Sequence, residues 1–304
     1  MLAIFMLLGA CGITEPPTDE GTTGTDGSSG GTGTGDTGTG DTGTSDTGTQ
    51  DNNTGDTGAY SNGTSTGGIG AGETGDTGQP QTTLENSEIF YESGGWKIYG
   101  TLYESESATP TKTIILVHEF DKDRSSWPIS FIEKLHNQFP EAIVLAIDLR
   151  GHGKSTNLGT WADFDAAAYK DMKTDIISAD KYIGAHYPDA EEYYVVGASL
   201  GSTAAILAGE QEKTIDKVVM ISPGMEYKGV DITRAAEDYS HDVMAVAANG
   251  DTYSANAVSE IDDLRNVEYT EVVIYPGSDH GTDLFAATAG GSEPLGDKIV
   301  EFLK

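Results

Sequence analysis

The chain has 304 residues and a formal net charge of −32, with 49 acidic side chains against 17 basic ones. Its first 85 residues contain no Lys or Arg, so the last 219 hold every basic residue and carry a net charge of −20 (17 − 37). Such an acidic surface argues against nucleic-acid binding, because contacts with phosphates need clustered Lys and Arg. About 219 residues are enough to bury the core of one α/β domain.

The chain begins with an apolar segment, residues 1–10, followed by its single cysteine, Cys11. This segment is too short to span a bilayer, and one cysteine excludes an intramolecular disulfide. Leu8-Gly9-Ala10-Cys11 resembles a bacterial lipobox. The resemblance implies that residues 1–11 are a lipoprotein signal peptide and that Cys11 carries a lipid anchor at the bacterial cell envelope, on the outer membrane or the cell surface. The alternative is an apolar stretch without this role.

Residues 12–85 consist mostly of Gly, Thr, Asp and Ser, with almost no apolar side chains. An aspartate recurs every five residues, at Asp36, Asp41, Asp46, Asp51 and Asp56. Such a segment cannot bury enough apolar surface to offset the entropy of ordering, so we predict a disordered linker. Calcium-binding repeats also carry regular aspartates, but they contain a periodic apolar residue that is missing here. A lipid-anchored cysteine followed by a disordered linker is typical of a surface lipoprotein.

The remaining residues, 86–304, predict one α/β domain. Strands at 87–91 and 96–103 flank turn glycines and form an antiparallel hairpin. Further apolar runs are continuous, as in strands buried on both faces, and they lie at 113–117, 142–147, 193–196, 218–221, 243–247 and 272–275. Helical patterns alternate with these strands, at 127–138, 164–186, 200–209, 232–239, 255–266 and 295–303. The alternation predicts a mostly parallel sheet with helices on both faces and a ligand site beyond the carboxyl ends of its strands.

The motif Gly197-Ala198-Ser199-Leu200-Gly201 lies between a predicted strand and a predicted helix. A Gly-x-Ser-x-Gly sequence in this position is typical of a nucleophile elbow, a strained turn that exposes the serine hydroxyl at the edge of the sheet. The glycines allow backbone segments to pass where a Cβ atom would clash. We therefore predict that Ser199 is a catalytic nucleophile.

A serine nucleophile needs a histidine base that an acidic side chain orients. Asp251 and His280 each follow a predicted strand and come in the chain order serine, acid, histidine. Both are expected on the same edge of the sheet as Ser199. The alternative acids are less suitable, because Asp279 is adjacent to the histidine, and Asp216 and Asp242 precede their strands.

The chain resembles the α/β-hydrolase superfamily, and within it the uncapped serine esterases and dienelactone-hydrolase-like members. Besides the elbow and the turns at Asp251 and His280, two segments carry the resemblance: Leu116-Val117-His118-Glu119-Phe120 with Arg124-Ser125-Ser126-Trp127, and Asp148-Leu149-Arg150-Gly151-His152-Gly153-Lys154-Ser155. The resemblance covers about residues 85–304. It implies a mostly parallel sheet with an N-terminal antiparallel hairpin, helices on both faces and no large cap.

The resemblance also implies an oxyanion hole made by the backbone N–H groups of Phe120 and Leu200. Glu119 departs from the family pattern, which has glycine after the histidine. A carboxylate beside an oxyanion is unfavourable unless it points to solvent or pairs with Lys122 or Arg124. His118 and His152 occupy family positions that brace loops.

Other chemistries find less support in the sequence. Gly151-His152-Gly153-Lys154-Ser155 ends like a phosphate-binding loop, but Asp148 stands where that motif requires glycine. No set of His, Asp or Glu has zinc-ligand spacing, so we expect neither a metal nor another cofactor.

We therefore expect a monomeric serine hydrolase that cleaves carboxylic esters through an acyl-enzyme. About 20 residues separate the predicted strands at 218–221 and 243–247, too few for a large lid. An open site favours small esters or ester groups attached to a polymer. The alternatives are a thioesterase or peptidase of the same fold, or a surface module that binds without catalysis.

Overall fold

The computed structural model describes residues 84–304, except residues 108, 266–269 and 287–292. The predicted signal peptide with Cys11, and all but the last two residues of the predicted linker, lie outside the described residues. Within the described residues, every helix is too short or too polar to cross a bilayer.

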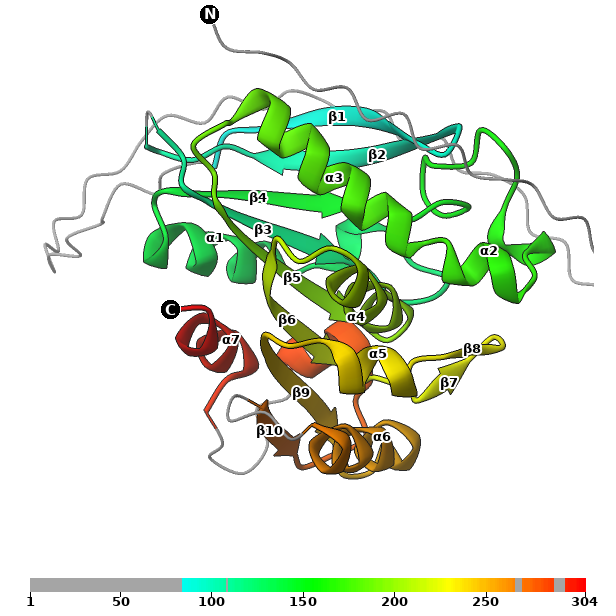
Figure 1. Cartoon of the computed structure of the whole chain (residues 1–304). Helices are drawn as coiled ribbons and strands as arrows, with labels where there is room; N and C mark the ends of the chain where they lie inside the picture. Colours follow the sequence, from blue (N-terminus) through cyan, green and yellow to red (C-terminus); the bar gives the residue numbers. More distant parts are fainter. Residues whose placement is uncertain (1–83, 108, 266–269, 287–292) are drawn as a thin grey trace, which may run out of the picture. The chain divides into compact units, whose positions relative to one another are not determined.

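Eight strands form one sheet in the order β1-β2-β4-β3-β5-β6-β9-β10 (Figure 1). The pairs β1–β2 and β2–β4 are antiparallel, and the other pairs in the sheet are parallel. The strands are β1 (Asn86–Ser93), β2 (Trp96–Tyr103), β3 (Lys112–Val117), β4 (Ala142–Ile147), β5 (Glu192–Ala198), β6 (Ile215–Ile221), β9 (Asp242–Ala248) and β10 (Thr270–Tyr275). All eight strands predicted from the sequence are present, and the predicted parallel sheet is confirmed.

The N-terminal hairpin is tighter than the sequence suggested. Its strands pair as far as Ser93 and Trp96, so the turn contains only Gly94 and Gly95. Both glycines have positive φ, +57° and +87°, as a two-residue turn between twisted strands requires.

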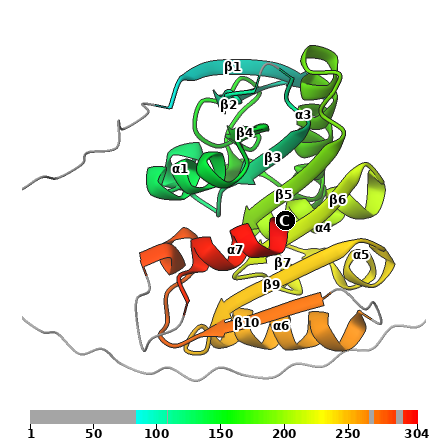
Figure 2. The same ribbon diagram turned by 90° about the vertical axis from the view of Figure 1, so that its left-hand side faces the viewer.

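Helices cover both faces of the sheet (Figures 1 and 2). On one face α1 (Ile129–Gln138) and α7 (Leu295–Leu303) pack against a core that includes Ile114, Val196 and Val246. The other face packs against α3 (Lys173–His186), α4 (Leu200–Gln211), α5 (Thr233–Asp238) and α6 (Thr252–Leu264). Every residue of β3 and β4 is buried, which explains the continuous apolar runs at 114–117 and 142–147.

The predicted helix at 164–186 is in fact two helices, α2 (Ala166–Lys170) and α3. Asp165 caps α2, since its carboxylate accepts a hydrogen bond from the Ala168 N–H at 2.9 Å. At the break the Thr174 hydroxyl donates to the Asp171 carbonyl at 2.7 Å, a local bond that competes with the helical ladder.

The segment between β6 and β9 holds a small hairpin, β7 (Glu226–Tyr227) and β8 (Val230–Asp231), followed by α5. Neither strand of this hairpin was predicted, because two-residue strands leave no periodic pattern. As expected from its length, the segment forms no large cap over the carboxyl edge of the sheet.

Candidate active site

Ser199 lies in the turn between β5 and α4, where the structure shows a strained backbone. Its φ of +48° and ψ of −110° are rare for any residue other than glycine. A conformation of this kind costs about 1–3 kcal/mol and persists only where the surrounding structure imposes it. Here the Ser199 N–H donates to the Ile221 carbonyl at 2.7 Å, which ties the turn to the end of β6.

The two glycines of the motif are required by close backbone packing. A Cβ atom on Gly197 would lie 2.3 Å from the Gly201 carbonyl oxygen, and one on Gly201 would lie 2.2 Å from the Val117 carbonyl oxygen. Both distances are far inside van der Waals contact. The glycines therefore let α4 begin directly against the ends of β5 and β3, which exposes the serine hydroxyl.

Asp251 and His280 project from two turns that are bonded to each other. These turns follow the neighbouring parallel strands β9 and β10. The Asn249 N–H donates to the Tyr275 carbonyl at 2.8 Å, and the Gly250 N–H donates to the Gly277 carbonyl at 2.7 Å. The pairing of the two strands thus continues past their ends and sets the spacing between the acid and the histidine. Asp251 also caps α6, which explains why this helix begins at Thr252 and not at the predicted residue 255.

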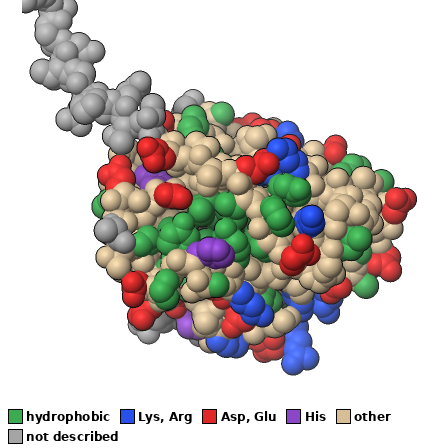
Figure 3. Space-filling model, turned by 90° about the horizontal axis from the view of Figure 1, so that it is seen from above, with side chains coloured by type: hydrophobic (Ala, Val, Ile, Leu, Met, Phe, Trp, Pro, Cys, Tyr) green, Lys and Arg blue, Asp and Glu red, His purple; other side chains and the backbone are tan. Residues whose placement is uncertain are grey.

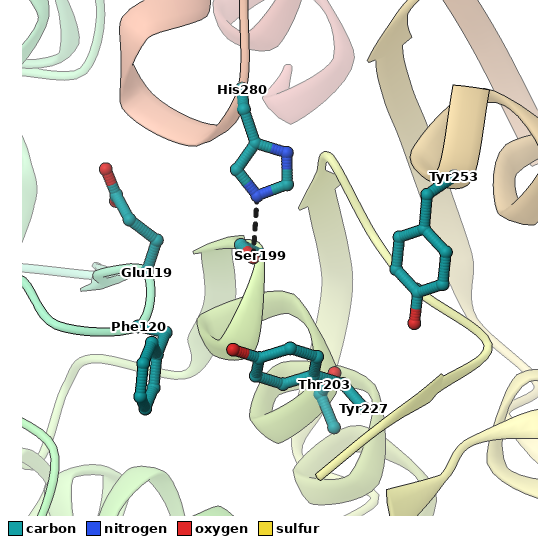
Figure 4. Close-up of a pocket in the computed structure, with 8 residues that line it drawn as sticks. Glu119, Phe120, Ser199, Thr203, Tyr227, Tyr253 and His280 are labelled. Atoms are coloured by element: carbon teal, nitrogen blue, oxygen red, sulfur yellow. Dashed lines mark hydrogen bonds between the residues drawn. The ribbon is translucent and has the colours of Figure 1, made fainter. Parts of the chain in front are cut away.

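Hydrogen bonds link Ser199, His280 and Asp251 in series. His280 Nδ1 lies 2.6 Å from Asp251 Oδ2. His280 Nε2 lies 2.8 Å from Ser199 Oγ, and Figure 4 marks this second contact with a dashed line. An ionised carboxylate can only accept, so Nδ1 carries the proton and Nε2 is free to accept from the serine hydroxyl. Burial raises the pKa of the Asp251 carboxyl, but hydrogen bonds from His280 and Ser254 outweigh this effect and leave that pKa below its ordinary value. The geometry is that of a serine with an oriented general base.

The backbone N–H groups of Phe120 and Leu200 have no acceptor among the described residues. Leu200 is the first residue of α4, where N–H groups lack intrahelical partners and the helix dipole favours negative charge. Phe120 belongs to the loop after β3 and lines the same pocket as Ser199. Neither group is therefore used by another hydrogen bond within the described residues, and the oxyanion hole that the sequence resemblance implied stays a prediction.

Glu119 is buried, with 6% of its surface exposed, and its carboxylate points away from Ser199 (Figure 4). The Thr282 hydroxyl donates to its Oε1 at 2.7 Å, whereas its buried Oε2 has no partner among the described residues. This differs from the two arrangements considered from the sequence, exposure to solvent or an ion pair with Lys122 or Arg124. The carboxylate instead joins the Phe120 loop to the loop of His280.

A second contact supports the loop of His280. The Gly281 N–H donates to the Ser222 hydroxyl at 2.9 Å, and Ser222 has a φ of +50° at the end of β6. Neither Ser222 nor Thr282 was predicted from the sequence. The available signals were positional only, since Ser222 directly follows a predicted strand and Thr282 lies two residues after the predicted base.

His118 and His152 brace loops and do not reach the reacting groups. His118 Nδ1 lies 2.6 Å from the Glu119 carbonyl, and its Nε2 accepts from the Leu149 N–H at 3.1 Å. Burial lowers the pKa of His118 to about 3, so it is neutral at physiological pH. His152 is buried, and its Nδ1 lies 3.1 Å from the Arg150 carbonyl.

The buried Asp148 carboxylate stabilises the loop that contains Phe120 through hydrogen bonds. Its carboxylate accepts from the Arg124 N–H at 2.9 Å, from Arg124 Nη1 at 2.5 Å and from the Lys154 N–H at 2.8 Å. These bonds join the loop after β3 to the loop after β4. Burial raises the pKa of Asp148, and hydrogen bonds from Lys154 and Arg124 reduce this rise.

Ser199 and His280 open into a pocket of about 270 Å³, which Glu119, Phe120, Thr203, Gly224, Tyr227 and Tyr253 complete. Neither tyrosine was predicted from the sequence, because no local pattern shows that Tyr227, in the segment after β6, and Tyr253, at the start of α6, lie beside Ser199. Among the described residues, no three His, Cys, Asp or Glu side chains cluster closely enough to hold a metal ion.

Comparison with known proteins agrees with this fold. Residues 108–257 match a family model described as serine aminopeptidase, S33, and a search of curated proteins found no match. Esterase Pf2001 of Pyrococcus furiosus superposes with a TM-score of 0.60 at 18% identity, over 72% of this chain and 90% of that chain. For a thermostable carboxyl esterase of Bacillus coagulans, the TM-score is 0.57 at 16% identity, with 73% and 98% covered. Dienelactone hydrolase of Anabaena variabilis gives a TM-score of 0.55 at 15% identity, with 71% and 94% covered.

Proposed function

The chain belongs to the α/β-hydrolase superfamily, and we propose that it is a serine hydrolase that cleaves carboxylic esters. The observation that carries this proposal is the hydrogen-bonded series Ser199–His280–Asp251. The backbone N–H groups of Phe120 and Leu200, which have no acceptor among the described residues, support it. A strained serine, a base already bonded to it and donors for a developing negative charge are the parts that acyl transfer requires.

In the proposed reaction, Ser199 Oγ attacks the ester carbonyl while its proton passes to His280 Nε2. The N–H groups of Phe120 and Leu200 stabilise the tetrahedral oxyanion. His280 then protonates the leaving alcohol, the C–O bond breaks, and an acyl-enzyme remains. Water attacks the acyl-enzyme with His280 again as base, which releases the acid and restores the serine. Asp251 orients the imidazole and stabilises its charged form.

Esters are the favoured substrate class for two reasons. The pocket of about 270 Å³ is smaller than the usual site of a drug-sized ligand, which suits a short acyl group. Two of the similar structures are described as esterases. The matched family model is described as a serine aminopeptidase, so a peptidase is the second candidate, and a thioesterase would use the same groups.

We also propose that the enzyme is anchored at the bacterial envelope through a lipid on Cys11 and acts there as a monomer. The proposal rests on the lipobox-like Leu8-Gly9-Ala10-Cys11 and on the long Gly- and Thr-rich segment that follows it.

Hydrolysis of chromogenic acetate and butyrate esters, measured beside aminoacyl amides and acyl thioesters, tests the proposed reaction. We expect the esters to be the best substrates and Ser199→Ala to lower their turnover by about 10³-fold or more. Equal loss of activity is expected for His280→Ala, with little further loss in the double variant, because the residues act as a unit. Amide hydrolysis that exceeds ester hydrolysis would favour the peptidase instead.

A further inference from the structure

Three of the eight residues that line the pocket at Ser199 are Phe or Tyr, and they come from separate parts of the chain. Phe120 comes from the loop after β3, Tyr227 from β7 and Tyr253 from the first turn of α6. Figure 4 shows the three rings around the space below and beside Ser199. A pocket of this composition offers flat apolar faces and few polar partners.

The rings are held in place before any ligand binds. Phe120 packs edge-to-face on Trp161 with 4.6 Å between ring centroids, and on Tyr227 with 5.9 Å. The Lys228 ammonium lies 4.4 Å from the Phe120 centroid and adds a cation–π contact. Rings fixed in this way lose little conformational entropy when a ligand packs against them.

Tyr253 is also fixed, although its side chain is exposed. Its hydroxyl donates to the Glu226 carbonyl. A Cβ atom on Gly224 would lie 2.5 Å from the Tyr253 ring, so only glycine leaves room for the ring there. Yet 52% of Tyr253 remains exposed. An exposed aromatic ring that is pinned across a pocket supplies a free face for a ligand.

The positions of His280 and of the aromatic rings determine which part of a bound ester, the alcohol or the acyl group, lies beside the rings. His280 must stand beside the leaving alcohol, since it protonates that oxygen. In Figure 4, Tyr227 and Thr203 lie on the opposite side of Ser199 from His280. The alcohol therefore leaves on the side of His280, and the acyl group extends toward the rings.

We infer that the preferred substrates are esters whose acyl group carries a planar aromatic ring, bound against Tyr227, Tyr253 and Phe120. This inference rests on the proposed ester hydrolysis and names its substrate class. A cavity of about 150 Å³ is enough to hold benzene, so about 270 Å³ accommodates a ring on a short linker. Ring pairs gain about 0.5–1.5 kcal/mol beyond the burial of their area, which distinguishes an aromatic ring from a saturated one of similar size.

Methyl phenylacetate and methyl cyclohexylacetate give the sharpest test, with acid release followed by titration. Both esters separate the ring from the carbonyl by one CH₂ group, but phenyl withdraws electrons, so its ester is intrinsically the more reactive. Each kcat/KM is therefore divided by the rate constant for alkaline hydrolysis of the same ester, and the phenyl-to-cyclohexyl ratio is the ratio of these corrected values. The saturated ring is at least as hydrophobic as the aromatic one, so apolar burial alone would not favour phenylacetate. We expect the corrected ratio to be about ten.

Variants of the tyrosines test the cause of this preference. Tyr227→Leu and Tyr253→Leu should each lower the phenyl-to-cyclohexyl ratio about threefold. Tyr227→Phe and Tyr253→Phe keep the rings and should retain most of the ratio. Phe90→Leu removes an equally exposed ring outside the pocket and should leave the ratio unchanged.

Hydrolysis of methyl acetate, which has no ring, tests the proposed ester hydrolysis separately from the preference for aromatic acyl groups. If the acetate is hydrolysed but the phenyl-to-cyclohexyl ratio is one or less, or is the same in the leucine and phenylalanine variants, the aromatic inference is wrong and the ester hydrolase stands. If no ester is hydrolysed and Ser199 does not react with a fluorophosphonate, the proposed function is wrong and the inference falls with it.

Discussion

Glu119 joins two loops that the proposed reaction needs at fixed positions. Glu119 lies between Phe120 and His118, whose ring accepts the Leu149 N–H. The Glu119 carboxylate accepts the hydroxyl of Thr282, two residues beyond His280. Glu119→Ala should therefore lower kcat for an acetate ester by about tenfold with little change in KM, because a misplaced base or oxyanion donor affects the transition state most. Steady-state kinetics of the purified variant measures this split.

Glu119→Gln is the matched control, since its side-chain oxygen still accepts the Thr282 hydroxyl. It should retain most of the activity that Glu119→Ala loses. A purely structural role would lower the melting temperature of Glu119→Ala but leave the kcat and KM of the folded variant unchanged. Equal activity in the alanine and glutamine variants would contradict the positioning role.

At the scale of residues, the sequence located Ser199, Asp251 and His280 because each follows a strand end in a recognisable turn. The structure brings these three side chains together, and Phe120 lines the same pocket as Ser199 and His280. It also places Thr282, rather than Lys122 or Arg124, next to Glu119. That contact depends on how two distant loops pack, which no local pattern encodes.

At the scale of elements, Asp148 is the main support between the loops after β3 and β4. Its side chain is 2% exposed and pairs with the Arg124 guanidinium, which is 12% exposed. Asp148→Asn would leave that guanidinium without its buried counterion and should lower the free energy of unfolding by about 3 kcal/mol. Urea unfolding followed by circular dichroism measures the change.

Glu88 offers a matched control for this prediction, because it also pairs with Arg124 but on the surface. Glu88→Gln should change the free energy of unfolding little, as exposed ion pairs contribute weakly. An Asp148→Asn variant as stable as Glu88→Gln would show that the buried pair does not support the loops.

The main elements could be predicted because their signals are local. Continuous apolar runs identified the buried strands, and alternating helical patterns identified the parallel connections. The break between α2 and α3 could not be predicted, because it depends on a local hydroxyl bond of Thr174 and on its contact with Arg150. The hairpin β7–β8 was missed because its strands are too short for periodicity.

At the scale of the whole domain, buried histidines predict sensitivity to acid. Burial lowers the pKa of His118 to about 3 and also lowers the pKa of His136 and of His152. In the unfolded chain a histidine has a pKa near 6.5. Below that pH the unfolded chain binds protons that the folded domain does not, so stability falls as the pH falls from about 6.5 toward the folded values.

Urea unfolding at pH 7.5 and at pH 5.5 measures the change in the free energy of unfolding. Both pH values lie above the ordinary pKa values of carboxyl groups. We expect His118 alone to account for about 1 kcal/mol of the loss over this interval. His118→Gln should reduce the pH dependence, because the substitution removes the buried group whose pKa is lowered. A domain equally stable at both pH values would contradict the prediction.

The surface of the domain is acidic, and acidic side chains lie scattered over the face in Figure 3. Membrane attachment would therefore have to come from the proposed lipid on Cys11 and not from charge. Expressed in a bacterium that processes lipoproteins, the full chain should appear in the membrane fraction, and Cys11→Ser should not be lipidated. The released and the anchored forms should hydrolyse esters equally well. A Cys11→Ser chain that remains processed and membrane-bound would contradict the anchor.

Labelling with a fluorophosphonate, followed by mass mapping of the modified peptide, tests the central claim most directly. The probe reports an activated serine without any assumption about the substrate. We expect one adduct on Ser199, formed more slowly in Asp251→Asn and absent in His280→Ala over the same time, because the base that activates the hydroxyl is missing. An adduct on another serine with Ser199 unmodified, or labelling of Ser199 that does not depend on His280, would contradict the account.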